Sequence, residues 1–143
     1  MRLIKTSYFA KIRMMCDSTH NYYSVTAVVP SADFDTGKYR NKPVTFLDLF
    51  ILDSVYITRP YKLGEIDEDE YERRYLKQLS DIPEEELKSV IDKVFYESGD
   101  KTPVFVCWEG TRRFCHRHIL ADFLNNHLGD ILEVKEVTTY WWD

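Results

Sequence analysis

The chain has 143 residues, a net charge of -5 at pH 7 and 44% hydrophobic residues. This length predicts one domain, residues 1–143, with enough apolar side chains for a core. The negative charge makes nucleic acid an unlikely partner for the surface as a whole, although a local basic pocket is compatible with it. No apolar run approaches the ~18 residues of a transmembrane helix, and residues 1–13 lack the pattern of a signal peptide. We therefore expect no membrane partner.

The cysteine count bears on the compartment. Three cysteines, an odd number, favour a reducing compartment over a disulfide framework, so we expect a cytoplasmic protein. Cys16 lies in a turn-rich stretch away from the other two and is expected to be structural.

In chain order, a first strand is expected at residues 2–6, with Ser7 and Tyr8 at its carboxyl end, and a helical turn at residues 10–15. Residues 22–29 have the composition of a second strand. Residues 30–43 predict a surface loop, either a solvated connector or a lid over a pocket. The apolar residues 46–57 predict a short helix and then a strand at residues 54–58, which Arg59 and Pro60 end.

The second half alternates helices and strands. Helices are expected to start in the acidic run 65–72, at residues 81–83 and near Cys115, and strands at residues 104–107 and 131–139. The predicted buried positions of the helices are Tyr71, Tyr75, Leu76, Leu79, Leu87, Val90, Ile91, Val94, Phe95, Ile119, Leu120, Phe123, Leu124 and Leu128. This alternation predicts an α/β fold: a three-layer, Rossmann-like arrangement with a mostly parallel sheet flanked by helices.

The chain ends in Tyr140, Trp141, Trp142 and Asp143. Exposed tryptophans favour packing, so we expect these rings to lie against the domain or against a second subunit. A homodimer is therefore possible.

Residues 104–118 carry the chemistry. They run from an apolar strand through a polar loop into a helix. In open α/β sheets, ligands bind at the carboxyl ends of strands, and the amino end of a helix favours an anion. Because the carboxyl ends of parallel strands share an edge, Ser7 and Tyr8 are expected to line the same pocket.

Cys115, in the first helical turn, is a candidate low-pKa nucleophile with His116 as its base. Cys107 is placed to face Cys115 across the loop. Each cysteine has an alternative as a packed core residue. The side chains expected to bind a ligand are Ser7, Tyr8, Glu109, Arg112, Arg113 and Arg117, whose guanidinium groups suit phosphate.

Two motifs deserve comparison with this stretch. Cys107, Gly110 and Arg113 fit CxxGxxR, the phosphate loop of cysteine phosphatases, but Val106 and Phe114 replace its usual His and hydroxyl residue. Cys107, Cys115 and His116 with a fourth ligand form an alternative zinc site. The seven-residue gap between the cysteines exceeds that of a zinc knuckle, so we predict no metal and no cofactor.

The block Cys107-Trp-Glu, followed by Cys115-His116-Arg117 with seven residues between the two cysteines, resembles the domain-of-unknown-function family 488 (DUF 488), short type. The stretches 6–10 and 74–75 are also similar to that family. The resemblance implies a compact three-layer α/β domain of bacteria and phages and implies no established reaction. Members tend to have Lys-Pro-Gly-Asp in the loop, where this chain has residues 110–113, Gly-Thr-Arg-Arg. The change favours an anionic ligand.

Three functions follow from these features. The first is binding of a phosphate-bearing small molecule, such as a nucleotide or its derivative, at the Cys107–Arg117 junction. The second is a Cys-dependent transferase or hydrolase that acts on such a ligand. The third is an interaction module without catalysis, in which the Cys-His-Arg block only locks the strand to the helix.

Overall fold

The computed structural model describes residues 1–12, 14–25, 44–45, 55–107 and 114–137. Its centre is a parallel sheet whose strands lie in the order β3-β2-β4-β1-β5. The strands are β1 (Arg2–Tyr8), β2 (His20–Ser24), β3 (Val44–Thr45), β4 (Thr102–Cys107) and β5 (Leu132–Glu136).

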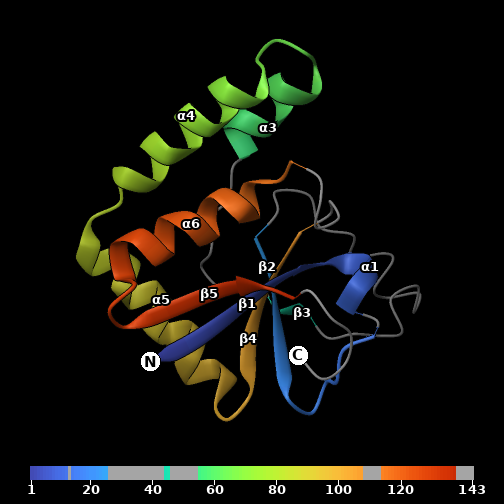
Figure 1. Cartoon of the computed structure of the whole chain (residues 1–143), viewed down its shortest axis with the longest axis vertical. Helices are drawn as coiled ribbons and strands as arrows, with labels where there is room; N and C mark the ends of the chain where they lie inside the picture. The colour runs from blue at the N-terminus through green and yellow to red at the C-terminus, as the bar shows by residue number, and fades with distance from the viewer. Residues whose placement is uncertain (13, 26–43, 46–54, 108–113, 138–143) are drawn as a thin grey trace.

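Helices cover the sheet on both sides (Figure 1). They are α1 (Phe9–Ile12), α3 (Val55–Lys62), α4 (Glu68–Ser80), α5 (Glu84–Ser98) and α6 (His116–Leu128). Helices α5 and α6 pack on one face of the sheet, α4 packs on the outer side of α6, and α1 lies on the opposite face. The predicted three-layer α/β fold with a parallel sheet is therefore confirmed.

Strand alternation divides the core between the two faces. In β4, Phe105 and Cys107 join the large cluster under α5 and α6, whereas Val104 and Val106 join the smaller cluster with α1. We call these the α6 face and the α1 face. Each side chain of a strand is thereby assigned to one layer, and the same alternation decides which polar groups meet.

Most of the helix predictions hold, although Val90 and Phe95 are only partly buried against the core. Asp67 caps α4, and its carboxylate accepts a hydrogen bond from the backbone N–H of Glu70 at 2.8 Å. Tyr71, Tyr75 and Leu79 are buried as predicted, but Leu76 is 36% exposed. Leu76 was wrongly placed in the buried stripe, because it adjoins Tyr75 in sequence but lies about 100° around the helix from it. Gly99, with a φ of +58°, ends α5 as predicted.

The strand predicted at residues 54–58 is wrong. Residues 55–62 form helix α3, and Pro60 lies inside that helix. Val55, Ile57 and Thr58 are β-branched and favour strands, but Ile57 is buried in the cluster under α4, and that packing decides the local structure. The predicted loop 30–43, the helix preceding α3 and the terminal tryptophans lie outside the described residues.

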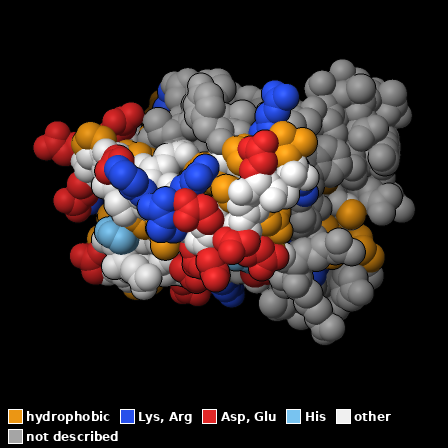
Figure 2. All heavy atoms as spheres, turned by 90° about the horizontal axis from the view of Figure 1, so that it is seen from above, with side chains coloured by type: hydrophobic (Ala, Val, Ile, Leu, Met, Phe, Trp, Pro, Cys, Tyr) orange, Lys and Arg blue, Asp and Glu red, His pale blue; other side chains and the backbone are white. Residues whose placement is uncertain are grey.

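Charges of both signs lie together on the end of the molecule that carries α3 and α4 (Figure 2). The first turn of α4 holds Glu68, Asp69 and Glu70, and Glu70 pairs with Arg73 and Arg74 farther along the helix. In the part of the chain that the structure describes, no helix has the length and apolar character to cross a membrane.

Strands β4 and β1 lie inside the sheet, away from its two edge strands. Strands β1 and β4 are neighbours, and their register pairs Tyr8 with Cys107 at the carboxyl edge. Helix α1 follows β1 onto one face, whereas α6 follows β4 onto the other. This divergence is a topological switch point, where open α/β sheets bind ligands.

Candidate functional site

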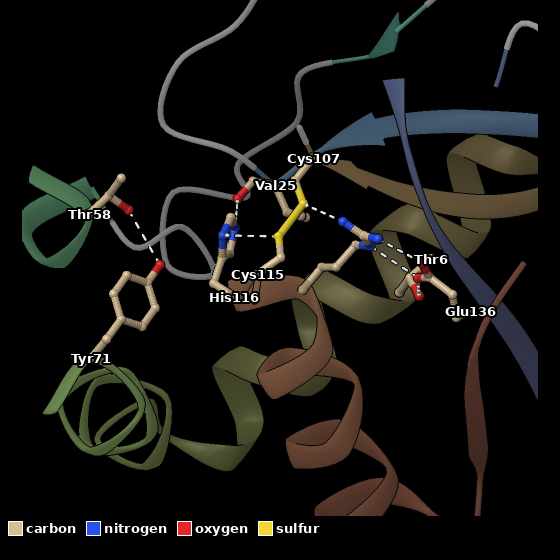
Figure 3. The surroundings of a disulfide bond; sticks show 9 residues. Thr6, Val25, Thr58, Tyr71, Cys107, Cys115, His116 and Glu136 are labelled. Atoms are coloured by element: carbon tan, nitrogen blue, oxygen red, sulfur yellow. Dashed lines mark hydrogen bonds and ion pairs between the residues drawn. A yellow bond between two sulfur atoms is a disulfide. The ribbon is translucent and has the colours of Figure 1, made fainter. Parts of the chain in front are cut away.

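The sulfur atoms of Cys107 and Cys115 lie at the switch point (Figure 3). Cys107 is the last residue of β4 and Cys115 is the N-cap of α6, and the two form a disulfide. The prediction that these cysteines face each other is confirmed. The sequence favoured a reducing compartment over a disulfide framework, and the structure joins this one pair because the fold brings the ends of β4 and α6 together. Cys16 is exposed and has a free thiol.

His116 is held between a carbonyl oxygen and a sulfur atom. Its Nε2 lies 2.5 Å from the carbonyl oxygen of Val25, and its Nδ1 lies 3.9 Å from Cys115 Sγ. A carbonyl oxygen only accepts, so Nε2 carries the hydrogen of the neutral ring and donates it. The lone pair on Nδ1 then faces the sulfur. The ring of Tyr75 packs edge-on against the buried His116 ring, with the two ring centroids 5.6 Å apart.

Among the residues that the structure describes, Arg117 has the largest fully buried side chain. Its Nε and Nη2 donate to the two carboxylate oxygens of Glu136 at 3.0 and 2.7 Å, and its Nη1 donates to Cys107 Sγ at 3.0 Å. Thr6 Oγ1 donates to the same carboxylate at 2.6 Å. The guanidinium fork that the sequence assigned to a ligand is thus directed at Glu136 and Cys107.

Ser7 and Tyr8, which the sequence predicts to line one pocket, lie on opposite faces of the sheet. The Tyr8 ring centroid lies 5.7 Å from the guanidinium carbon of Arg117, so Tyr8 is part of the junction. Ser7 is its neighbour, and strand alternation places it on the α1 face. The buried Ser7 hydroxyl has no hydrogen-bond partner among the described residues.

Glu109, Arg112 and Arg113 lie outside the described residues, together with the rest of the CxxGxxR loop. Their assignment to a phosphate ligand stays a prediction. The described part of the site is therefore a cluster of five side chains, which we call the junction cluster: Cys107, Cys115, His116, Arg117 and Glu136.

Sequence reasoning missed Glu136 and the carbonyl group of Val25. A signal for Glu136 was present. Leu132 and Val134 alternate onto the buried face of β5, and Glu136 continues that series. A carboxylate at an inward position needs a buried partner, which Arg117 supplies. The backbone carbonyl of Val25 carries no signal in its side chain.

The cluster has two chemical capacities. When the disulfide is reduced, a Cys115 thiol beside the His116 imidazole has the arrangement of an activated nucleophile. In addition, the donor atoms of Cys107, Cys115 and His116 all lie within 4.8 Å of one another, a group that can hold a metal ion.

No protein-family model matches the chain, and comparisons with curated proteins and with solved structures also give no match. The resemblance to DUF 488 therefore stays a prediction, and the function has to be argued from the junction cluster.

Proposed function

We propose that this protein is a Cys-dependent transferase or hydrolase that acts on a phosphate-bearing small molecule, with Cys115 as nucleophile and His116 as base. The observation that carries the proposal is the position of His116. The Val25 carbonyl holds the proton on Nε2, so Nδ1 is the basic nitrogen and it faces Cys115 Sγ at 3.9 Å. Nucleophile, base and orienting group stand in the order of a catalytic triad.

The reaction begins from the reduced protein. Nδ1 of His116 takes the proton of the Cys115 thiol, and the thiolate sulfur forms a bond to the electrophilic atom of the substrate. The bond to the leaving group breaks, and that group takes the proton from the imidazolium. In hydrolysis, His116 then deprotonates water, which displaces the sulfur and regenerates the thiol. In transfer, an acceptor hydroxyl group replaces the water.

Arg117 and Cys107 have supporting roles in this scheme. Arg117 joins β4 to β5 through Cys107 and Glu136, so it fixes the start of α6 and with it the positions of Cys115 and His116. The guanidinium group also favours a thiolate at Cys107 in the reduced protein. The charge of Glu136 offsets part of that effect.

The substrate class follows from the location at the carboxyl edge and the amino end of α6. The N-cap residue Cys115 makes no side-chain hydrogen bond to its helix, so it does not compete with an anion for the first-turn N–H groups. Arg112, Arg113 and Glu109 are the side chains proposed to complete the pocket. The same features support a second candidate, binding of the ligand without chemistry. Free thiols are maintained in the cytoplasm, where we place the protein.

The test compares the reduced wild-type protein with Cys115→Ser and Cys16→Ser. Each is incubated with a panel of nucleotides, nucleotide derivatives and simple phosphate esters, and product formation and thermal shift are recorded. The proposal expects turnover in wild type and Cys16→Ser and loss of at least ~100-fold in folded Cys115→Ser. Turnover that survives in Cys115→Ser contradicts it. A thermal shift without turnover in any form leaves the binding function.

A further inference from the structure

The junction cluster contains a set of soft metal ligands. Thiolate sulfur and imidazole nitrogen are the ligands that Zn²⁺ prefers, and Cys107, Cys115 and His116 supply two sulfurs and one nitrogen. Their donor atoms all lie within 4.8 Å of one another and all three residues are buried. Two thiolates balance the double charge of the ion, so the site can be buried without net charge.

The surroundings of the cluster fit a metal site as well as its ligands do. A metal-binding histidine donates its other ring N–H to a carboxylate or a carbonyl group, which points the free nitrogen at the ion. His116 donates from Nε2 to the Val25 carbonyl and turns Nδ1 toward the sulfurs (Figure 3). Arg117 donates to Cys107 Sγ at 3.0 Å and is itself held by Glu136. Each of these contacts orients a ligand atom.

The backbone spacing supports a shared ion. The Cα atoms of Cys107 and Cys115 are 7.8 Å apart, whereas the Cα atoms of ordinary disulfides are about 4.4–6.8 Å apart. Two Zn–S bonds of ~2.3 Å at a tetrahedral angle hold sulfurs roughly 3.8 Å apart, which suits a wider backbone separation. The seven-residue gap is longer than that of a zinc knuckle, but the end of β4 and the start of α6 bring the two cysteines together.

We propose that the reduced protein binds one Zn²⁺ ion through Cys107 Sγ, Cys115 Sγ and His116 Nδ1. Binding displaces the two thiol protons, so affinity rises with pH. Three protein ligands leave the fourth position of a tetrahedral ion to water or to a ligand oxygen. The metal site stands without the proposed function. Only one consequence rests on that function: Zn²⁺ occupies the Cys115 thiolate and Nδ1 of His116, so it inhibits the thiol chemistry.

The experiment uses the full chain carrying Cys16→Ser, which removes the exposed thiol. The reduced protein is titrated with Zn²⁺, and bound metal is measured by elemental analysis after gel filtration. Titration with Co²⁺ reports thiolate ligands by a sulfur-to-cobalt charge-transfer band. One ion per chain with that band is expected. Cys107→Ser, Cys115→Ser and His116→Asn should each lower the affinity at least 10-fold, whereas the matched control His20→Asn should not.

Zinc protection provides a measurement that does not depend on the variants folding. In the wild-type protein, Zn²⁺ should slow alkylation of Cys107 and Cys115 and leave that of Cys16 unchanged, as peptide masses report. Less than stoichiometric metal, equal protection of all three thiols, or a charge-transfer band that survives in folded Cys115→Ser overturns the site. Failure of the proposed function is distinguished by activity: metal-free reduced protein that binds Zn²⁺ but turns over no substrate retains the site and loses the function.

Discussion

Two buried histidines on opposite faces of the sheet each have one ring nitrogen on a backbone carbonyl oxygen. His116 on the α6 face has Nε2 on the Val25 carbonyl and Nδ1 toward Cys115. His20, on the α1 face, has Nδ1 2.9 Å from the carbonyl oxygen of Cys16 and Nε2 3.1 Å from Lys5 Nζ. In each ring the carbonyl group holds the hydrogen on one nitrogen and leaves a lone pair on the other.

The difference lies in what that lone pair meets. Lys5 donates a hydrogen bond to Nε2 of His20. Cys115 instead offers a thiol that can give up its proton to Nδ1 of His116, or a thiolate that can share a metal ion. The fixed tautomer of His20 therefore supports a structural hydrogen bond, whereas that of His116 leaves a nitrogen that can take a proton or bind a metal ion. The predictions below test that distinction.

The largest effect is expected from removing the buried charge of the junction cluster. Arg117→Met removes the fully buried guanidinium group and leaves the mostly buried carboxylate of Glu136 without its ion-pair partner, so it should lower the free energy of unfolding by about 3–5 kcal/mol. Lys5→Met should cost less, because it removes a hydrogen bond to an imidazole and not an ion pair with a carboxylate. Urea denaturation of both variants measures this. Equal losses of stability in Arg117→Met and Lys5→Met would contradict a special role for the Arg117–Glu136 ion pair. Adding Glu136→Gln to Arg117→Met should restore part of the stability.

Reduction of the disulfide is expected to have the next largest effect. The Cys107–Cys115 bond spans a sequence separation of 8, and loss of so short a closed loop should lower stability by roughly 2–3 kcal/mol. Denaturation with and without a phosphine reductant measures the difference. Cys107→Ser should be insensitive to the reductant and Cys16→Ser should keep the full response. A response in Cys107→Ser would mean that the reductant acts elsewhere.

A smaller effect separates the two histidines directly. In the reduced protein, His116→Asn removes the base beside Cys115 and should slow its alkylation at pH 7 about tenfold, or ~1.4 kcal/mol. His20→Asn should leave the rate unchanged, since His20 belongs to the other face. Rates of iodoacetamide labelling, read peptide by peptide, provide the measurement. Equal slowing in both variants would show a general loss of structure instead of a specific base.

The smallest effect is expected at an exposed pair that serves as a reference for both buried clusters. Hydrogen bonds from Arg73 and then Arg74 lower the pKa of Glu70 from 4.5 to about 2. Because the folded-state pKa is the lower one, the stabilisation is complete above pH 4.5 and is lost as the pH falls toward 2. Glu70→Gln should therefore be slightly less stable at pH 7, with solvent limiting the difference. Thermal melts should converge near pH 2; a gap that widens in acid would contradict this.

The sequence alone determined the alternation of elements and the position of the chemistry within it. Apolar runs, caps and Gly99 placed β4, α4, α5 and α6, because these signals come from residues that are neighbours along the chain. The same local pattern put Cys107 at the end of a strand and Cys115 at the start of a helix. It failed at residues 55–58, where β-branched side chains favoured a strand and packing of Ile57 imposed a helix.

Only the tertiary structure decided the partners of the junction cluster. The Val25 carbonyl is 91 residues from His116 in sequence, and Glu136 meets Arg117 because β5 pairs with β1. Strand order and register set those meetings, and they depend on burial across the whole sheet. The tertiary structure also places Ser7 on the α1 face, away from the junction cluster, and pairs Arg117 with Glu136. Residue types can thus be read from local sequence, whereas the group that each nitrogen or sulfur faces is a property of the complete fold.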